Sequence, residues 1–443
     1  MKTFQHNKFK TWWANVNTTF ALQIFNILRF ISTFFAGVVL VKVGWTEGSI
    51  ESYEYLLVTF GMLTFFWISG TQNGLLSLLP KASKEEQAFF LKKSLSVVFA
   101  FGVLVSGLIL FLGPFVSISL NSNWLFWLCI YSLLNIPSLF LHVKYLLEKN
   151  AQKILLFGGL NFFAQFMFIA IPAWRGAGLT GVLIAMTILA GLRFLYFLYD
   201  AGLDFNFDPK YRHWLKRWGL LSLPLSLHIL IGVSPEYVDA FLVEYFVEKE
   251  GAYAIYKYGA RELPLVISLI AALATAVLPV IAEDEPKGLV LLKAKANRLS
   301  HILFPAAIVL MFLSPFLFEF FYNSTFRDSA IVFNVYLLIL LTRMFLPQVL
   351  ITARQNNYIL LWCGITEFVV NVGVSIMLVS SYGLFGIAIG TVAGNFIQKV
   401  LMSIYVKRNY GLPISAYVPL KTIAIYSLGL LVSFWLSISF TGF

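Results

Sequence analysis

The most informative residues of this chain are ionisable side chains that lie inside long apolar runs. Arg29, Arg261 and Arg343 fall deep inside such runs, and Lys257 lies one turn outward of Arg261. A central charge costs about 2.5–3.5 kcal/mol when a helix inserts into a bilayer, so these side chains should face protein or water. Arginine holds phosphate oxygens through two parallel hydrogen bonds and stays charged when dehydrated. The set therefore predicts a cationic cavity for an anionic headgroup.

Polar neighbours at helical spacing strengthen this interpretation. Gln23, Asn26 and Arg29 recur every three residues, which places them along one face of a helix. Lys257 and Arg261 are four residues apart and share a face of another helix. The predicted substrate-binding residues are Gln23, Asn26, Arg29, Lys257, Arg261 and Arg343.

A second group consists of acids and one histidine. His228, Glu236 and Asp239 follow one stripe of the run 219–246, and Glu367 lies inside the run 358–379. These residues are the candidates for coupling transport to H+ or Na+. The alternative is that they balance the charge of the buried bases through internal ion pairs, and the sequence leaves both roles open.

Other polar residues predict no further chemistry. Arg193 and Lys399 lie nearer the inner ends of their runs, so we expect them to extend to the cytoplasmic interface. Cys129 and Cys363 have no metal-ligand spacing. The match to G-x-G-x-x-G at 176–181 opens an apolar run instead of following a strand. We therefore predict no metal and no cofactor.

The composition places these residues in a membrane. The chain is 59% hydrophobic and 12% charged, with a mean hydropathy of +0.81, so the bilayer must act as its solvent. The apolar runs long enough to span it are 18–42, 53–80, 94–117, 124–147, 154–174, 177–199, 219–246, 252–281, 299–321, 329–351, 358–379, 383–406 and 417–440.

Loop charges set the orientation of these thirteen predicted spans. With a cytoplasmic N-terminus, the outer loops contain only Arg175, Lys249 and Arg327, and the remaining loop bases lie inside. The positive-inside rule therefore predicts a cytoplasmic N-terminus. The same rule explains the net charge of +11 without nucleic acid as a partner.

An internal repeat predicts the architecture. Residues 131–199 align without a gap with 336–404, matching Tyr131 to Tyr336 and the glycine turn at 178–181 to that at 383–386. Six spans per half make the two repeats parallel. We therefore expect an all-α polytopic membrane protein with two six-helix bundles around a central cavity. The predicted parts are a bundle at 1–203, a cytoplasmic linker at 204–218, a bundle at 219–410 and an extra transmembrane helix at 411–443.

The chain resembles a known family of transporters. The stretch from Tyr253 through Arg261 and Pro264 to Pro279, and Asn371 followed by 382–388, are similar to hairpins of the polysaccharide-export (O-antigen) branch of the multidrug/oligosaccharidyl-lipid/polysaccharide (MOP) flippase superfamily. The resemblance extends to the lipid II flippases, where it implies that Arg29 and Arg261 line the cavity. It also implies a bacterial cytoplasmic (inner) membrane protein.

The predicted function is therefore that of a flippase. It would move a polyprenyl-pyrophosphate-linked glycan from the cytoplasmic to the outer leaflet by alternating access. A multidrug/cation antiporter of the same fold is the alternative, although such proteins usually carry an acid in the N-terminal bundle, where the first run offers Arg29. An enzyme is not expected, because every outer loop is too short to form a catalytic domain.

Overall fold

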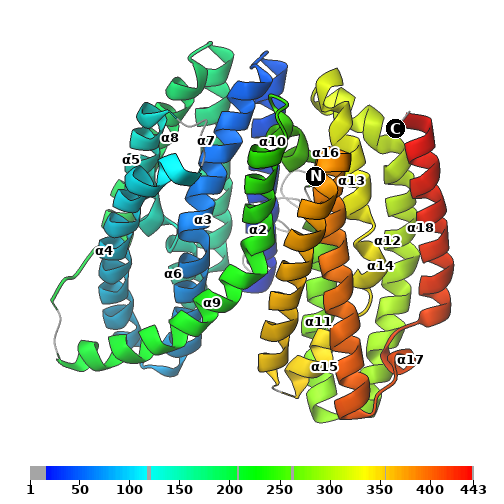
Figure 1. Cartoon of the computed structure of the whole chain (residues 1–443). Coiled ribbons are helices and arrows are strands. Elements are labelled where there is room, and N and C mark those ends of the chain that lie inside the picture. The colour runs from blue at the N-terminus through cyan, green and yellow to red at the C-terminus, as the bar shows by residue number, and fades with distance from the viewer. Residues whose placement is uncertain (1–15, 117–120, 207–208, 261–263, 355, 442–443) are drawn as a thin grey trace, which may run out of the picture. The chain divides into compact units, whose positions relative to one another are not determined.

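The computed structural model describes residues 16–116, 121–206, 209–260, 264–354 and 356–441 (Figure 1). Within these ranges the chain forms helices and no strand. Ten helices among the described residues are long and apolar enough to cross a membrane. The expected all-α polytopic fold is therefore confirmed, and every predicted apolar run contains helical residues.

The chain divides into two compact units, Met1–Leu230 and Ile231–Phe443. Residues 204–218, which we expected to link the halves, belong to the first unit, and the division falls inside one helix, α9. The first unit contains α2 (Thr18–Lys42), α3 (Glu47–Leu78), η1 (Leu79–Lys81), α4 (Lys84–Val116), α5 (Ser122–Ser138), α6 (Leu141–Leu147), α7 (Ala151–Trp174), α8 (Gly178–Asp200) and α9 (Pro209–Phe246) as far as Leu230.

Helix α2 packs along α7 because a glycine lets an aromatic ring approach the backbone. A Cβ atom on Gly158 would lie 2.6 Å from Cδ2 of Phe25. The same ring meets Phe162 edge-on, with 4.9 Å between centroids, and stacks on His142 at 5.2 Å. This contact buries one side of α2 and fixes the direction of its opposite side.

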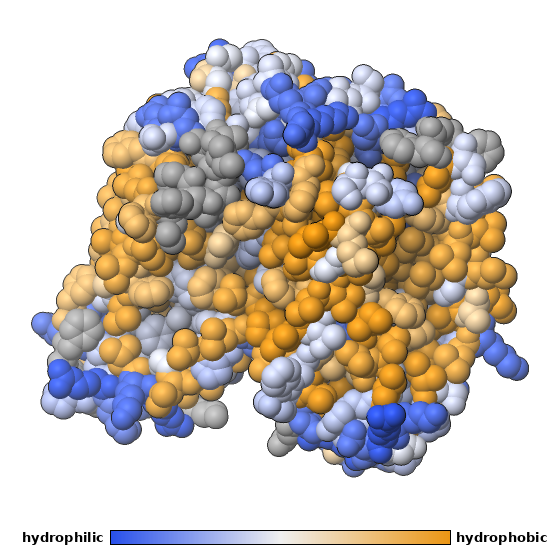
Figure 2. Space-filling model, in the orientation of Figure 1, coloured by the Kyte–Doolittle hydropathy of each residue, from blue (hydrophilic) through white to orange (hydrophobic). Residues whose placement is uncertain are grey.

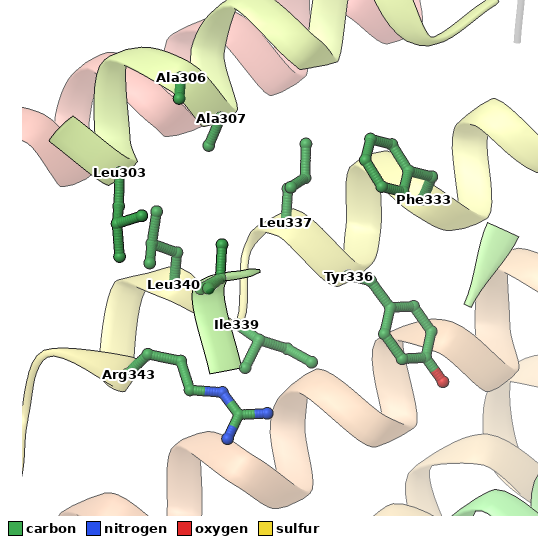
Figure 3. A pocket seen from close by; sticks show the side chains of 10 residues that line it. Leu303, Ala306, Ala307, Phe333, Tyr336, Leu337, Ile339, Leu340 and Arg343 are labelled. Atoms are coloured by element: carbon green, nitrogen blue, oxygen red, sulfur yellow. The ribbon is translucent and has the colours of Figure 1, made fainter. Parts of the chain in front are cut away.

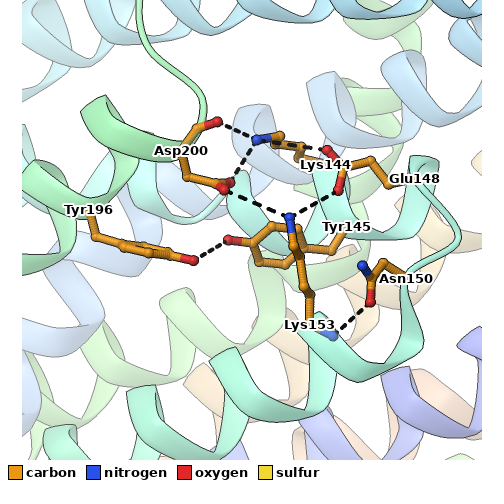
Figure 4. A network of polar contacts seen from close by, with 7 residues as sticks. All are labelled: Lys144, Tyr145, Glu148, Asn150, Lys153, Tyr196 and Asp200. Atoms are coloured by element: carbon orange, nitrogen blue, oxygen red, sulfur yellow. Dashed lines mark hydrogen bonds and ion pairs between the residues drawn. The ribbon is translucent and has the colours of Figure 1, made fainter. Parts of the chain in front are cut away.

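Ion pairs join the ends of α6, α7 and α8 (Figure 4). Lys144 Nζ lies 2.7 Å from Asp200 Oδ2 and 3.7 Å from Glu148 Oε1. Lys153 Nζ lies 3.7 Å from Glu148 Oε2 and 3.9 Å from Asp200 Oδ1. The positive-inside rule places Lys144 and Lys153 on the cytoplasmic side. Their ion pairs also hold the ends of these helices together.

The second unit begins within α9 and includes the extra C-terminal helix. Its remaining elements are α10 (Ala252–Gly259), α11 (Pro264–Glu283), α12 (Glu285–Phe321), η2 (Ser324–Asp328), α13 (Ser329–Leu337), α14 (Leu340–Arg343), α15 (Pro347–Ala353), α16 (Asn357–Tyr410), α17 (Ile414–Tyr417) and α18 (Leu420–Thr441).

Helix α16 contains two predicted spans and reverses direction at Gly383, whose φ is +53°. Its two halves touch closely because glycines replace side chains between them. A Cβ on Gly390 would lie 2.8 Å from the Asn371 carbonyl oxygen, and one on Gly394 would lie 2.7 Å from that of Glu367. The hairpin therefore brings polar residues of both halves to one place.

The extra helix α18 is an integral part of the second unit. Thr422 donates a hydrogen bond of 2.6 Å to Asn297 Oδ1, and the Tyr426 hydroxyl lies 2.8 Å from Nδ1 of His301 on α12. On the face drawn in Figure 2, apolar residues occupy the middle of each unit and hydrophilic residues gather at its ends. Each unit thus has the surface of a membrane-embedded helix bundle.

Candidate functional site

The polar face of α2 is the part of the predicted site in the first unit. Gln23, Asn26 and Arg29 are all exposed, whereas Phe25, one helical turn before Arg29, is buried. Among the described residues, no acid forms an ion pair with Arg29. A lipid-facing guanidinium would cost about 2.5–3.5 kcal/mol, so this face suits a watery cavity.

The predicted bases of the eighth run have different environments. Lys257 on α10 forms an ion pair with Glu236 on α9, and their side chains are 22% and 59% exposed. Arg261 lies outside the described residues, between the end of α10 and the start of α11 at Pro264. A predicted binding residue and a predicted coupling residue are thus partners, which is the arrangement expected for charge balance.

Asp239 lies at the centre of a buried polar cluster in the second unit. Its carboxylate is 1% exposed and accepts hydrogen bonds from three hydroxyls and one amide. At Oδ2 the donors are Tyr256 at 2.6 Å, Thr391 at 2.9 Å and Tyr336 at 3.3 Å, and at Oδ1 the donor is Asn371 at 3.5 Å. Among the described residues, no base forms an ion pair with this carboxylate.

This Asp239 cluster has the chemistry of a site for a small cation. Burying a carboxylate is costly unless polar groups or an opposite charge compensate it, and here the donors are neutral. Ser375 Oγ and the Ile387 carbonyl lie next to the cluster, joined by a hydrogen bond of 3.2 Å. Carboxylate, hydroxyl and carbonyl oxygens are the ligands that hard cations prefer. A proton on Asp239 would remove the same charge.

Glu367 belongs to a second polar cluster of the same unit. It accepts hydrogen bonds from Gln398 and, at 3.4 Å, from Asn395. Lys399 lies one residue further along α16 and is 6% exposed, so the expectation that it extends to the interface is wrong. Its Nζ donates to Oε1 of Gln348, in the first turn of α15, at 3.2 Å.

Arg343 lies within electrostatic range of Lys399 and lines a cavity of about 60 Å³ (Figure 3). The other lining residues are apolar except Tyr336, which also belongs to the Asp239 cluster. Contact between Arg343 and substrate stays a prediction.

Two other expectations change with the structure. Arg193 does not extend to the interface but donates hydrogen bonds to Asn135 Oδ1 at 3.1 Å, the Asn161 carbonyl at 3.3 Å and Gln165 Oε1 at 3.3 Å. These oxygens on α5 and α7 hold the guanidinium inside the first unit. His228 is exposed on the part of α9 in that unit, so the predicted stripe from His228 to Asp239 is divided between units.

Sequence reasoning missed the hydroxyl and amide partners of the buried acids. Asn371 and Ser375 are four residues apart, as are Thr391 and Asn395, so each pair lies on one face of its half of α16. That spacing was readable in the sequence. It also missed Glu54, a buried acid of α3 that is 3% exposed.

The fold and its buried polar clusters are those of a polytopic membrane protein, and comparison with known proteins gives the family. The model of the family described as "Lipid II flippase MurJ" matches residues 154–443. The chain therefore belongs to the lipid II flippase MurJ family. No curated protein sequence matches it.

Solved structures agree with this fold. An inward closed conformation of the lipid II flippase MurJ matches with a TM-score of 0.64 and 18% identity, over 94% of this chain and 93% of the other. An inward-facing multidrug resistance transporter of the MATE family matches with 0.65 and 17%, over 88% and 98%. A MOP superfamily transporter from Pyrococcus furiosus matches with 0.61 and 16%, over 90% and 95%.

These findings refine the expected family. The chain is a multi-pass protein of the inner membrane with the fold of flippases and MATE transporters. The match is to lipid II flippases, whereas the sequence resemblance pointed first to the polysaccharide-export branch. Membership in that branch is not supported by the matches.

Proposed function

We propose that this protein moves a polyprenyl-pyrophosphate-linked oligosaccharide from the cytoplasmic to the outer leaflet by alternating access. The glycan would then serve the assembly of cell-surface polysaccharide. The observation that carries the proposal is the exposed polar face of α2 with Arg29, in a member of a lipid II flippase family. A pyrophosphate needs a permanent positive charge that survives partial dehydration, and arginine provides it.

The binding face is built before substrate arrives. Phe25 is locked against Gly158, so α2 cannot rotate to bury Arg29 without losing this packing. Asn26 and Gln23 supply amides for the phosphate and sugar oxygens. Lys257, Arg261 and Arg343 are the proposed contacts from the second unit, with Glu236 keeping Lys257 partly neutralised.

We assign ion coupling to the Asp239 cluster. Its four neutral donors stabilise the charged carboxylate but leave a net negative charge buried, which a proton or Na+ would cancel. The donors come from α10, α13 and both halves of α16, so cation binding would pull these helices together. Release of the cation would loosen the packing of these helices. That loosening would change the side of the membrane to which the substrate cavity opens.

The glycan is the finer part of the proposal. An O-antigen type oligosaccharide follows from the sequence resemblance, and lipid II follows from the name of the matching family. Both would present the same pyrophosphate to Arg29. The distinction therefore requires transport of both substrates by the same preparation.

Multidrug/cation antiport is the second candidate, and one observation favours it. Glu54 is a buried acid of the first unit, in the second turn of α3 and at the start of the predicted run 53–80. An acid there would bind organic cations, and the fold match to a MATE transporter is equally good. Arg29 on the neighbouring helix would oppose a cationic drug.

The test is transport by the full chain in liposomes. We expect the lipid-linked oligosaccharide to reach the opposite leaflet with wild type and Arg175→Ala, which removes an exposed outer arginine, but not with Arg29→Ala. All three proteins should show the same thermal unfolding. Efflux of an organic cation dye that requires Glu54, without movement of either glycolipid, would replace the proposal by antiport.

A further inference from the structure

The first turns of α9 carry an unusually regular division between buried aromatic and exposed basic residues. Tyr211, Trp214 and Trp218 are 0%, 8% and 3% exposed. The basic and histidine residues between them, Arg212, His213, Lys216 and Arg217, are all exposed. Spacings of three and four place each set on its own side of the helix.

The aromatic side is fixed to the first unit. Trp214 stacks on Phe90 of α4, with 4.9 Å between centroids and 7° between planes. Trp218 Nε1 donates a hydrogen bond of 3.2 Å to the Thr71 carbonyl of α3. Figure 1 shows these turns of α9 crossing the ends of α3 and α4. The basic side must therefore face outward.

The exposed side of α9 changes from basic to apolar within one helical turn. Beyond Gly219 it presents Leu220, Leu223 and Leu227, which are 67%, 62% and 49% exposed. An exposed leucine surface on a membrane protein faces acyl chains, and bases one turn before it lie at the level of lipid phosphates. None of the four basic or histidine side chains forms an ion pair with a described residue.

We propose that Arg212, Lys216 and Arg217 form a binding surface for anionic phospholipid of the cytoplasmic leaflet. The phosphate contacts the bases, and the acyl chains lie along the leucines that follow. The continuity of basic and apolar surface favours an amphiphile over a soluble polyanion. This surface lies apart from Arg29 and from the Asp239 cluster, so the inference does not depend on the proposed substrate.

The binding test uses the full chain in neutral detergent. Short-chain phosphatidylglycerol and phosphatidylcholine are titrated separately, and retained lipid is counted by native mass spectrometry. The test variant is Arg212→Gln/Lys216→Gln/Arg217→Gln. The matched control is Lys295→Gln/Lys407→Gln/Arg408→Gln, which removes three exposed bases of the second unit. Thermal unfolding of each variant shows whether it is folded.

We expect wild type and control to prefer phosphatidylglycerol, and the test variant to bind it on the order of 100-fold more weakly at low salt. In wild type, 1 M salt should remove most of the preference, because exposed charges are screened. That measurement needs no variant. Equal binding of both lipids by wild type, an equal loss in the control, or full binding by the folded test variant would each overturn the proposal.

Discussion

Removing the Tyr256 hydroxyl tests whether Asp239 is held as a charged carboxylate. The Tyr256 hydroxyl donates to Asp239 Oδ2 at 2.6 Å, the range of a charge-assisted O–H···O⁻ bond, and both residues are buried. A hydrogen bond to a charged group contributes about 1.5–3 kcal/mol, against about 0.5–1.5 kcal/mol for a neutral one. Tyr256→Phe should therefore lower the free energy of unfolding by about 1.5–3 kcal/mol.

A double-mutant cycle with Asp239→Asn isolates the charged part of this bond. In the Asn background only a neutral partner remains, so the two changes should couple by about 1–1.5 kcal/mol. Loss of the 3.0 Å contact between Tyr256 and Tyr336 occurs in both backgrounds and cancels. Tyr258 lies two residues further along α10, and its hydroxyl is outside the Asp239 cluster. Tyr258→Phe should therefore lower the free energy of unfolding by less than Tyr256→Phe does.

The assay is reversible denaturant unfolding of the detergent-solubilised full chain, with each variant measured in the same conditions. Additive effects of the two substitutions, within about 0.5 kcal/mol, would refute a charge-assisted bond. So would a Tyr256→Phe cost no larger than that of Tyr258→Phe. Either result would mean that Asp239 is held neutral, which would favour a bound proton over Na+.

Three further outcomes follow from other contacts. Arg193→Leu should lower the free energy of unfolding by about 2–3 kcal/mol, because it leaves buried oxygens without a donor, and Arg193→Lys should restore little in thermal unfolding. Gly390→Ala should cost about 1–3 kcal/mol and weaken the ion dependence of transport, since its Cβ would lie 2.8 Å from the Asn371 carbonyl. A backbone N–H and then Lys93 hold the pKa of Asp204 below its ordinary value of 3.8. The stabilisation is therefore present above pH 3.8 and lost as pH falls through the lowered pKa, and hydrogen exchange at 204–206 should rise on acidification in wild type but not in Asp204→Asn.

The sequence alone determined the membrane class, the helical fold and the repeated halves. A spanning helix is visible in the sequence as a long, continuous apolar run, because about 20 residues in a row must lie in the hydrocarbon of the bilayer. The repeat was equally readable, since the turn at Gly178 and the turn at Gly383 both require positive φ, which glycine adopts without strain. The polar face of α2 was also predictable, because Gln23, Asn26 and Arg29 are three residues apart and this spacing is a property of a single helix.

Tertiary structure decided the partners of each charge. Lys399 and Arg193 looked like interfacial bases by depth, but neighbouring helices supply oxygens that hold them inside. Asp239 was predicted as a coupling or balancing acid, yet its donors come from residues up to 152 positions away. Depth is set by position along one helix, whereas hydrogen-bond partners depend on which faces of distant helices meet. That pairing depends on packing, including glycines such as Gly390 that allow two helices to touch.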